Sequence, residues 1–212
     1  MHIPDGILDP KVWASSAIVT VAVLAKSVQY SRSKLQYRAV PVMGVMSAFI
    51  FASQMINFPL LGAATSGHLI GGALAALLFG FWPATLIMTT VVAIQAIVFQ
   101  DGGITALGTN LLNMAILAPG VAALVYRLLR SVSFISRSVK IFITSWLSVQ
   151  TVTLVVAIEL ALSGVVPFGT GVKALLFWHT FIGIGEGIIT AIVLPFALRS
   201  SFQLRQEESL TQ

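Results

Sequence analysis

Long apolar runs are the feature that most constrains what this chain of 212 residues can fold into. A helix needs about 20 mostly apolar residues to cross the hydrocarbon core of a bilayer. Only 9% of the residues are charged, whereas soluble globular domains carry about 25%. The chain is therefore predicted to be an all-α, multi-pass integral membrane protein. About seven transmembrane helices are expected, the third of them short, at Val12–Tyr30, Ala39–Asn57, His68–Trp82, Pro83–Gln100, Leu111–Arg130, Lys140–Ser163 and Lys173–Ser200.

The basic residues predict how these helices are oriented. They gather in three clusters after the first, fifth and seventh runs: Arg32, Lys34 and Arg38; Arg127, Arg130, Arg137 and Lys140; Arg199 and Arg205. If the third and fourth runs cross the membrane separately, all three clusters lie on one side, and an excess of Lys and Arg marks the cytoplasmic side. The N-terminus is therefore predicted outside. A single transmembrane domain at residues 1–200 is followed by a short cytoplasmic tail at residues 201–212.

The composition excludes several classes of function. There is no cysteine, so the chain can form neither a disulfide nor a thiolate metal site. The basic residues behind the net charge of +5 cluster next to apolar runs and do not form a basic stripe. The expected partner is therefore the lipid bilayer and not a nucleic acid. No G-x-x-x-x-G-K-[ST] phosphate loop occurs, and no nucleophile paired with a base stands out. The chain is therefore predicted not to be an enzyme, and any ATP hydrolysis must come from partner chains.

The first six residues are unusual in so apolar a chain: Met1-His2-Ile3-Pro4-Asp5-Gly6. With no Lys or Arg before Lys11, they do not form a secretory signal peptide. A free amine on Met1, the amide nitrogen of His2 and Nδ1 of His2 can close two fused chelate rings around one metal. That would fill three corners of a square. Square-planar nitrogen coordination favours Ni(II) or Cu(II), with Co(II) as a further option, over Zn(II), which prefers tetrahedral sites.

His68 is the predicted source of the fourth nitrogen. It opens the third apolar run within Thr65-Ser66-Gly67-His68, and the predicted topology puts it near the outer surface, on the same side as His2. Neutral imidazole is the commonest metal ligand in proteins, and the positive end of a helix dipole helps to keep it unprotonated. The competing interpretation is that a histidine at a helix start only binds backbone groups or interfacial water.

Three stretches together resemble the CbiM/NikM family, the substrate-binding membrane components of energy-coupling-factor (ECF-type ABC) transporters for cobalt and nickel: Met1-His2-Ile3-Pro4-Asp5-Gly6, Thr65-Ser66-Gly67-His68 and Phe99-Gln100-Asp101-Gly102-Gly103-Ile104-Thr105-Ala106-Leu107-Gly108. The resemblance covers most of the chain. It implies a seven-helix bundle with the N-terminal segment inserted toward the core. It also implies that Ni(II) or Co(II), the transported substrate, is bound by the Met1 amine, the His2 amide nitrogen and side chain, and His68.

The same resemblance implies partners and a location. The partners are a transmembrane coupling subunit, ATP-binding ATPase subunits and a small accessory membrane subunit similar to CbiN or NikN. The location is the inner (plasma) membrane of a prokaryotic cell. No cofactor is implied apart from the transported Ni(II) or Co(II).

Four further polar residues are expected at outer helix ends, Asn57, Gln100, Asp101 and Asn110, and Asp5 is an additional candidate. Histidine ligands usually need a partner that fixes the orientation of the ring, and these side chains are candidates for that role. The competing interpretation is that they only cap helices at the membrane interface.

Glu159, His179 and Glu186 lie within predicted transmembrane helices, where an ionisable residue is costly and points to function. They carry the alternative hypothesis, a self-sufficient proton-coupled metal carrier or channel. Structural pairing within the bundle is the competing explanation. A third hypothesis, a membrane enzyme with a two-histidine metal centre, requires an open coordination position and a nearby general base.

Overall fold

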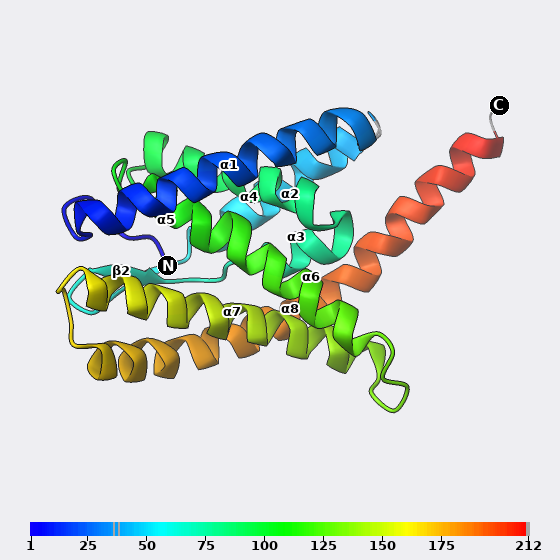
Figure 1. Ribbon diagram of the computed structural model, residues 1–212. Coiled ribbons are helices and arrows are strands. Elements are labelled where there is room, and N and C mark those ends of the chain that lie inside the picture. The colour runs from blue at the N-terminus through cyan, green and yellow to red at the C-terminus, as the bar shows by residue number, and fades with distance from the viewer. Residues whose placement is uncertain (36, 38, 211–212) are drawn as a thin grey trace.

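The computed structural model describes residues 1–35, 37 and 39–210, with side chains up to residue 199. It is a bundle of helices (Figure 1), which are α1 (Pro10–Lys34), α2 (Ala39–Gln54), α3 (Gly72–Phe79), α4 (Phe81–Val98), α5 (Leu107–Leu111), α6 (Ala118–Leu129), α7 (Arg137–Leu162) and α8 (Phe168–Leu210). A π-helix, η1 (Leu112–Leu117), joins α5 to α6 without a break. α8 continues through most of the segment predicted as a tail.

In the described part of the chain, five helical segments are long and apolar enough to cross a membrane: Pro10–Lys34, Phe81–Val98, Leu107–Leu129, Arg137–Leu162 and Phe168–Arg199. α2 is also apolar but shorter, at 16 residues. The prediction of a helical, multi-pass integral membrane protein is confirmed.

The prediction of a transmembrane helix over His68–Trp82 is wrong. Thr65–Gly67 forms strand β2, which pairs antiparallel with β1 (Phe58–Leu60), and residues 68–71 have no regular structure. α3 has only 8 residues, which at a rise of 1.5 Å per residue is about 12 Å, far less than the ~30 Å hydrocarbon core. Gly71 and Gly80 bound this helix with φ values of 78° and 81°, a conformation that glycine adopts at little cost. A short hairpin, an extended stretch and a short helix thus replace one long helix.

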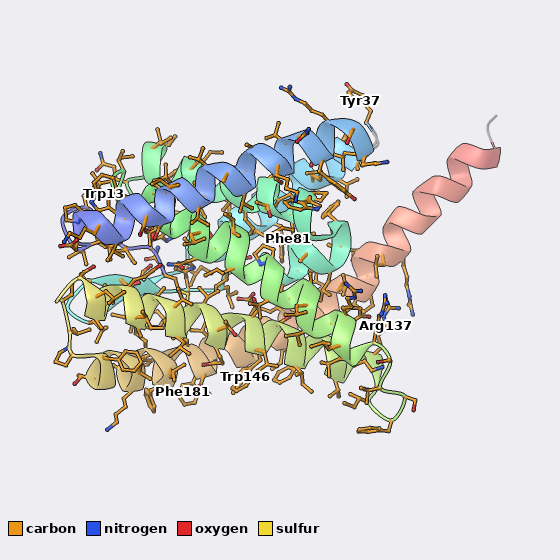
Figure 2. The ribbon with its side chains drawn as sticks, viewed as in Figure 1. Trp13, Tyr37, Phe81, Arg137, Trp146 and Phe181 are labelled. Atoms are coloured by element: carbon orange, nitrogen blue, oxygen red, sulfur yellow. The ribbon has the colours of Figure 1, made fainter. Side chains whose placement is uncertain are left out.

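The helices place most members of the predicted basic clusters at one end of the bundle. Figure 1 shows that the end of α1, the α6–α7 connection and the end of α8 lie at the same end, whereas β2 and the start of α1 lie at the other. Figure 2 labels Tyr37 and Arg137 at the first end and Trp13 at the second. Arg38, one of the predicted cluster residues, lies outside the described residues. The arrangement agrees with the charge pattern from which the orientation was predicted, and the orientation itself stays a prediction.

Small residues let α3 sit at the centre of the bundle. It packs against α4, α6, α7 and α8, and Ala73 and Ala75 are fully buried. A Cβ added to Gly72 would lie 2.8 Å from the Cβ of Ala118 in α6. Helices in membranes approach most closely where such small side chains meet. Residues 68–71 lead directly into this central helix.

The N-terminal segment folds back into the bundle. Asp9 caps α1 by accepting a hydrogen bond of 2.8 Å from the Lys11 N–H, and Pro10, which lacks an N–H, occupies the first helical position. The chain before this cap is therefore free to turn inward. Met1 and Ile3 are fully buried and His2 is 3% exposed, which confirms the expected insertion toward the core.

Candidate metal site

The backbone of the N-terminal segment is held by a side chain of α5 and by the loop that precedes this helix. The Ile3 N–H donates to Asn110 Oδ1 at 2.9 Å, and Asn110 Nδ2 donates back to the Ile3 carbonyl at 3.0 Å. That carbonyl also accepts from the Gly103 N–H at 2.9 Å. A Cβ on Gly103 would lie 2.4 Å from the Asp5 nitrogen, so only glycine lets the Asp101–Gly103 loop approach this closely.

Asp5 fastens the same loop from the outside. Its carboxylate accepts from the Thr105 hydroxyl at 2.5 Å and from the Thr105 and Ile104 N–H groups at 2.7 and 3.0 Å. The Thr105 hydroxyl holds the pKa of this carboxyl below its usual range against the opposing effect of burial, and the backbone N–H groups add smaller contributions in the same direction as the hydroxyl. Asp5 therefore fixes the N-terminal segment rather than facing the two histidines.

The N-terminal segment, strand β2 and the stretch that follows β2 bring two histidines and the chain terminus together. The Met1 amine lies against Nε2 of His68 and 3.1 Å from Ser66 Oγ. The His2 N–H donates to the same Ser66 Oγ at 3.0 Å. The His2 and His68 rings stack with centroids 4.6 Å apart and an interplanar angle of 24°. The Met1 amine, the His2 amide and both imidazoles thus meet in one buried place.

Hydrogen bonds assign the tautomer of each ring. His2 Nε2 lies 3.1 Å from Gln95 Oε1, an acceptor, so Nε2 carries the proton and Nδ1 keeps its lone pair. Nδ1 of His68 lies 2.7 Å from the Leu69 carbonyl, so in this ring Nδ1 carries the proton and Nε2 keeps the lone pair. The His68 lone pair faces the Met1 amine, and the His2 Nδ1 lone pair has no hydrogen-bond partner in the described structure. These are the tautomers that leave one nitrogen of each ring open to a metal.

Burial favours the unprotonated forms of the Met1 amine and the His2 ring. Met1 and His2 precede the first membrane-spanning helix, and burial lowers the pKa of the Met1 amine well below its usual value, with the Asp101 charge opposing. Burial, then the nearby terminal charge, lowers the pKa of His2 to about 3, against the hydrogen bond to Gln95. A neutral His2 forms no ion pair with Asp101, although its Nδ1 lies 3.4 Å from Asp101 Oδ1 and has no hydrogen-bond partner in the described structure.

The remaining expected residues divide into two groups. Asp101 lies beside His2, accepts a hydrogen bond of 2.8 Å from Asn57 Nδ2, and has a pKa raised chiefly by burial. Gln100 is exposed with φ at 56°, and within the described residues its side chain forms no hydrogen bond. Sequence reasoning gave no role to Gln95 or Ser66. The signal for Gln95 was an amide inside an otherwise apolar helix.

The donor set is rich in nitrogen and poor in carboxylates. Among the described residues, no group of three or more His, Cys, Asp and Glu side chains is placed to hold a metal ion. Any metal at this site must therefore draw on the backbone nitrogens of Met1 and His2 as well as the two rings. Such a set suits Ni(II), Cu(II) or Co(II) and not the oxygen-seeking Mg(II) or Ca(II).

Glu159, His179 and Glu186 bond other groups, although Nε2 of His179 has no hydrogen-bond partner in the described structure. Glu159 Oε2 accepts from Asn113 Nδ2 at 2.7 Å. Nδ1 of His179 lies 2.9 Å from the Leu175 carbonyl one turn earlier in α8, and Glu186 accepts from the backbone after His68. In the described part of the chain these three side chains form no hydrogen bond with one another.

Known proteins similar to this chain are metal transporters. A family model described as "Cobalt uptake substrate-specific transmembrane region" (CbiM) matches residues 2–204. A protein of Archaeoglobus fulgidus, named as a fused nickel transport protein NikMN, is 40% identical over 92% of this chain, which spans only 65% of that protein's length. The cobalt transport protein CbiM of Lachnoclostridium phytofermentans is 30% identical, and the match covers 92% of this chain and 80% of that protein.

The fold has been seen in a solved structure. The crystal structure of a truncated transition metal transporter matches with a TM-score of 0.88 and 33% identity, covering 94% of this chain and 99% of that one. Since the family model matches almost the whole chain and these relatives match over most of it, the chain belongs to the CbiM family of substrate-specific membrane components for cobalt and nickel uptake.

Proposed function

We propose that this protein captures Ni(II) or Co(II) at the outer face of the membrane, as the substrate-binding component of an energy-coupling-factor transporter. The observation that carries the proposal is the meeting of the Met1 amine, the His2 amide, the His2 ring and His68 Nε2 in one buried place. The Met1 amine and the His2 amide both bond Ser66 Oγ, so they face a common point.

The chemistry of these donors explains the choice of metal. The Met1 amine and the His2 amide close a first chelate ring, and the His2 amide and Nδ1 close a second. Loss of the amide proton on binding makes that nitrogen a strong ligand, and His68 completes a square. Gln95 and the Leu69 carbonyl hold the two rings in the required tautomers, as outer partners of metal-binding histidines generally do. Nitrogen donors suit nickel and cobalt alike, so the proposal covers both.

Energy for uptake would come from other chains. The proposed partners are a transmembrane coupling subunit and ATP-binding ATPase subunits. A small accessory membrane subunit is also proposed, because relatives named as fused nickel transport proteins, NikMN and LarMN, are considerably longer than the part this chain matches. The self-sufficient carrier draws less support, since Glu159, His179 and Glu186 are bonded separately.

Metal binding to purified protein in detergent tests the proposal. His68→Ala removes a ligand, and because loss of a group that only orients a ligand already costs about 10–100-fold in affinity, we expect more than 100-fold weaker Ni(II) binding. His179→Ala, which removes another buried imidazole, should stay within a few-fold of the native protein. Equal losses in the two variants would move the site deeper into the bundle. Ni(II) flux into vesicles that contain this chain alone would instead support the carrier.

A further inference from the structure

Residues 68–71, the segment that carries His68, lie inside the bundle without regular structure. Backbone N–H and C=O groups in such a place need partners, because lipid and apolar side chains offer none. Two side chains supply them. Glu186 Oε2 accepts from the Ile70 N–H at 2.6 Å and Oε1 accepts from the Gly71 N–H at 3.0 Å. Gln54 Nε2 donates to the Ile70 carbonyl at 2.5 Å.

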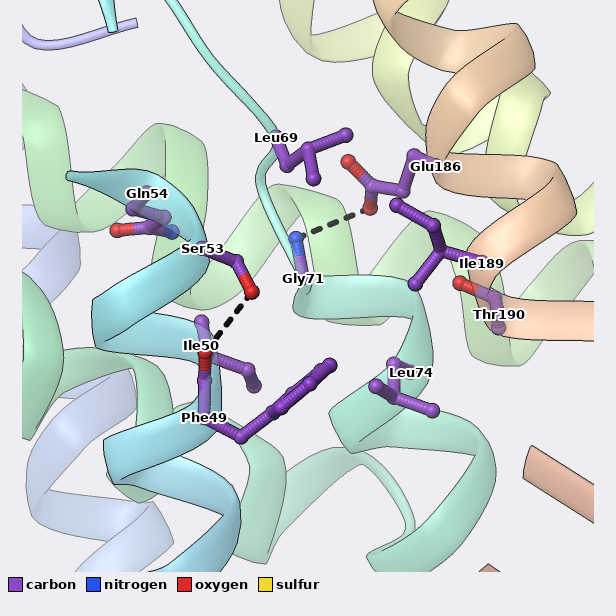
Figure 3. Close-up of a pocket in the computed structure, with 10 residues that line it drawn as sticks. All are labelled: Phe49, Ile50, Ser53, Gln54, Leu69, Gly71, Leu74, Glu186, Ile189 and Thr190. Atoms are coloured by element: carbon purple, nitrogen blue, oxygen red, sulfur yellow. Dashed lines mark hydrogen bonds between the residues drawn. The ribbon is translucent and has the colours of Figure 1, made fainter. Parts of the chain in front are cut away.

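These hydrogen bonds hold two consecutive peptide planes. The Ile70 carbonyl and the Gly71 N–H belong to one planar unit, which Gln54 and Glu186 hold from opposite edges. Figure 3 shows Gln54 of α2 and Glu186 of α8 on opposite sides of this segment, beside a pocket that both residues line. Glu186 is 3% exposed and Gln54 is fully buried, so water does not compete for these bonds.

The first of the two planes, the Leu69–Ile70 peptide unit, connects Glu186 to the candidate metal site. The Ile70 N–H that Glu186 holds lies in the same planar unit as the Leu69 carbonyl. That carbonyl is the group 2.7 Å from Nδ1 of His68, and it fixes both the tautomer and the direction of the ring. A carboxylate in α8 therefore sets, through one rigid peptide unit, where Nε2 of His68 points.

We propose that Glu186 and Gln54 are positioning residues of the metal site, which grip the Leu69–Gly71 backbone and so aim His68 at the metal. The inference rests on the proposed function and adds to it a role for two buried residues that do not touch the metal. It also gives Glu186 a task that uses both carboxylate oxygens as acceptors, in place of proton transfer.

The test compares matched variants of the full-length protein loaded with Ni(II). Glu186→Gln keeps the size of the side chain, but an amide accepts from only one of the two N–H groups and turns its own N–H₂ toward the other. Hydrogen bonds to charged groups are the strong ones, so we expect Ni(II) to dissociate about 10-fold faster or more in a chelator challenge. The visible absorption band of bound Ni(II) should change as well, because His68 is turned.

Glu159→Gln is the control. It makes the same chemical change at another buried carboxylate, which bonds Asn113 and not the His68 segment, and both the dissociation rate and the absorption band should stay as in the native protein. If Glu186→Gln does not fold, Gln54→Leu removes only the donor to the Ile70 carbonyl, and it should show the same two changes to a smaller degree.

The outcomes separate the inference from the proposed function. Native protein that fails to bind Ni(II) or Co(II) overturns both. Native protein that binds, with binding lost in His68→Ala but dissociation and absorption unchanged in Glu186→Gln, overturns the inference alone. Equal acceleration in Glu186→Gln and Glu159→Gln also overturns it, because it would reflect general loosening of the bundle.

Discussion

Adding one residue before Met1 is the sharpest test of the N-terminal donor set. A glycine placed there turns the terminal amine into an amide, whose lone pair is delocalised into the peptide bond. It also needs space, because consecutive Cα atoms lie about 3.8 Å apart. Met1 is fully buried, and its nitrogen lies 3.1 Å from Ser66 Oγ and against His68. The extended chain must therefore push Met1 away from His68.

The expected loss of affinity follows from what is removed. Changing a group that only orients a metal ligand costs about 10–100-fold in affinity. The extension deletes a direct ligand and opens one chelate ring, so we expect Ni(II) and Co(II) binding to weaken by more than about 100-fold, or about 2.8 kcal/mol. The helices should form as before, because the segment before Asp9 lies outside α1.

Isothermal titration of Ni(II) into purified protein measures this loss, with circular dichroism as the check on folding. The matched control carries the same glycine after Gln212, which adds a residue without altering the amine. Acetylation of the Met1 amine should act like the N-terminal glycine. Affinity that is unchanged after either modification of Met1, in a protein that remains folded, would show that the terminal amine is not a ligand.

Three further predictions concern how the N-terminal segment is held. Gly103→Ala puts a Cβ 2.4 Å from the Asp5 nitrogen, which forces the loop and the N-terminal segment apart, and it should weaken Ni(II) binding in the same titration. Gly44→Ala is the control and should leave binding unchanged, because there is open space around the new Cβ. Asn110→Leu leaves the buried Ile3 N–H without its partner and should lower the free energy of unfolding by about 1–3 kcal/mol, measured by denaturant titration in detergent; no change would contradict the assigned contact. The pKa of Asp5 is lowered from 3.8, so the contribution of its carboxylate to stability is present above that value and is lost as the pH falls through the lowered pKa. Asp5→Asn should therefore flatten the fall in melting temperature below about pH 4. An unaltered profile would refute the role of Asp5 in holding the N-terminal segment.

Apolar length predicted most of the fold, because lipid requires helices wherever long apolar runs cross it. It failed at His68–Trp82, where the same composition forms β2, an extended stretch and α3. Apolar residues indicate burial and not backbone conformation. An extended backbone at this depth is stable only because Gln54 and Glu186 satisfy it, and partners 16 and 116 residues away cannot be recognised from one sequence.

The site was predictable to a similar extent. The proposed N-terminal chelate follows from the covalent structure of the first two residues, so Met1 and His2 could be named as candidates without a fold. His68 required only that two segments lie on the same side of the bilayer. Gln95 and Ser66 could not be assigned, since a single amide in an apolar helix and a hydroxyl in a hairpin have many common roles, and only their contacts with His2 and Met1 distinguish them.

The inserted N-terminus has a consequence for the order of biosynthesis. The N-terminal segment contacts Ser66, Gln95 and Asn110, which lie 65, 93 and 107 positions beyond Met1, His2 and Ile3, respectively. Contacts over such separations form late, because the entropy cost of closing a long loop comes before the contacts contribute any stability. Until more than half of the chain has been made, the terminal amine stays open to enzymes that process nascent chains. If the Met1 amine is a metal ligand, as proposed, any group left on that nitrogen has to be removed in this interval, before the bundle closes around it.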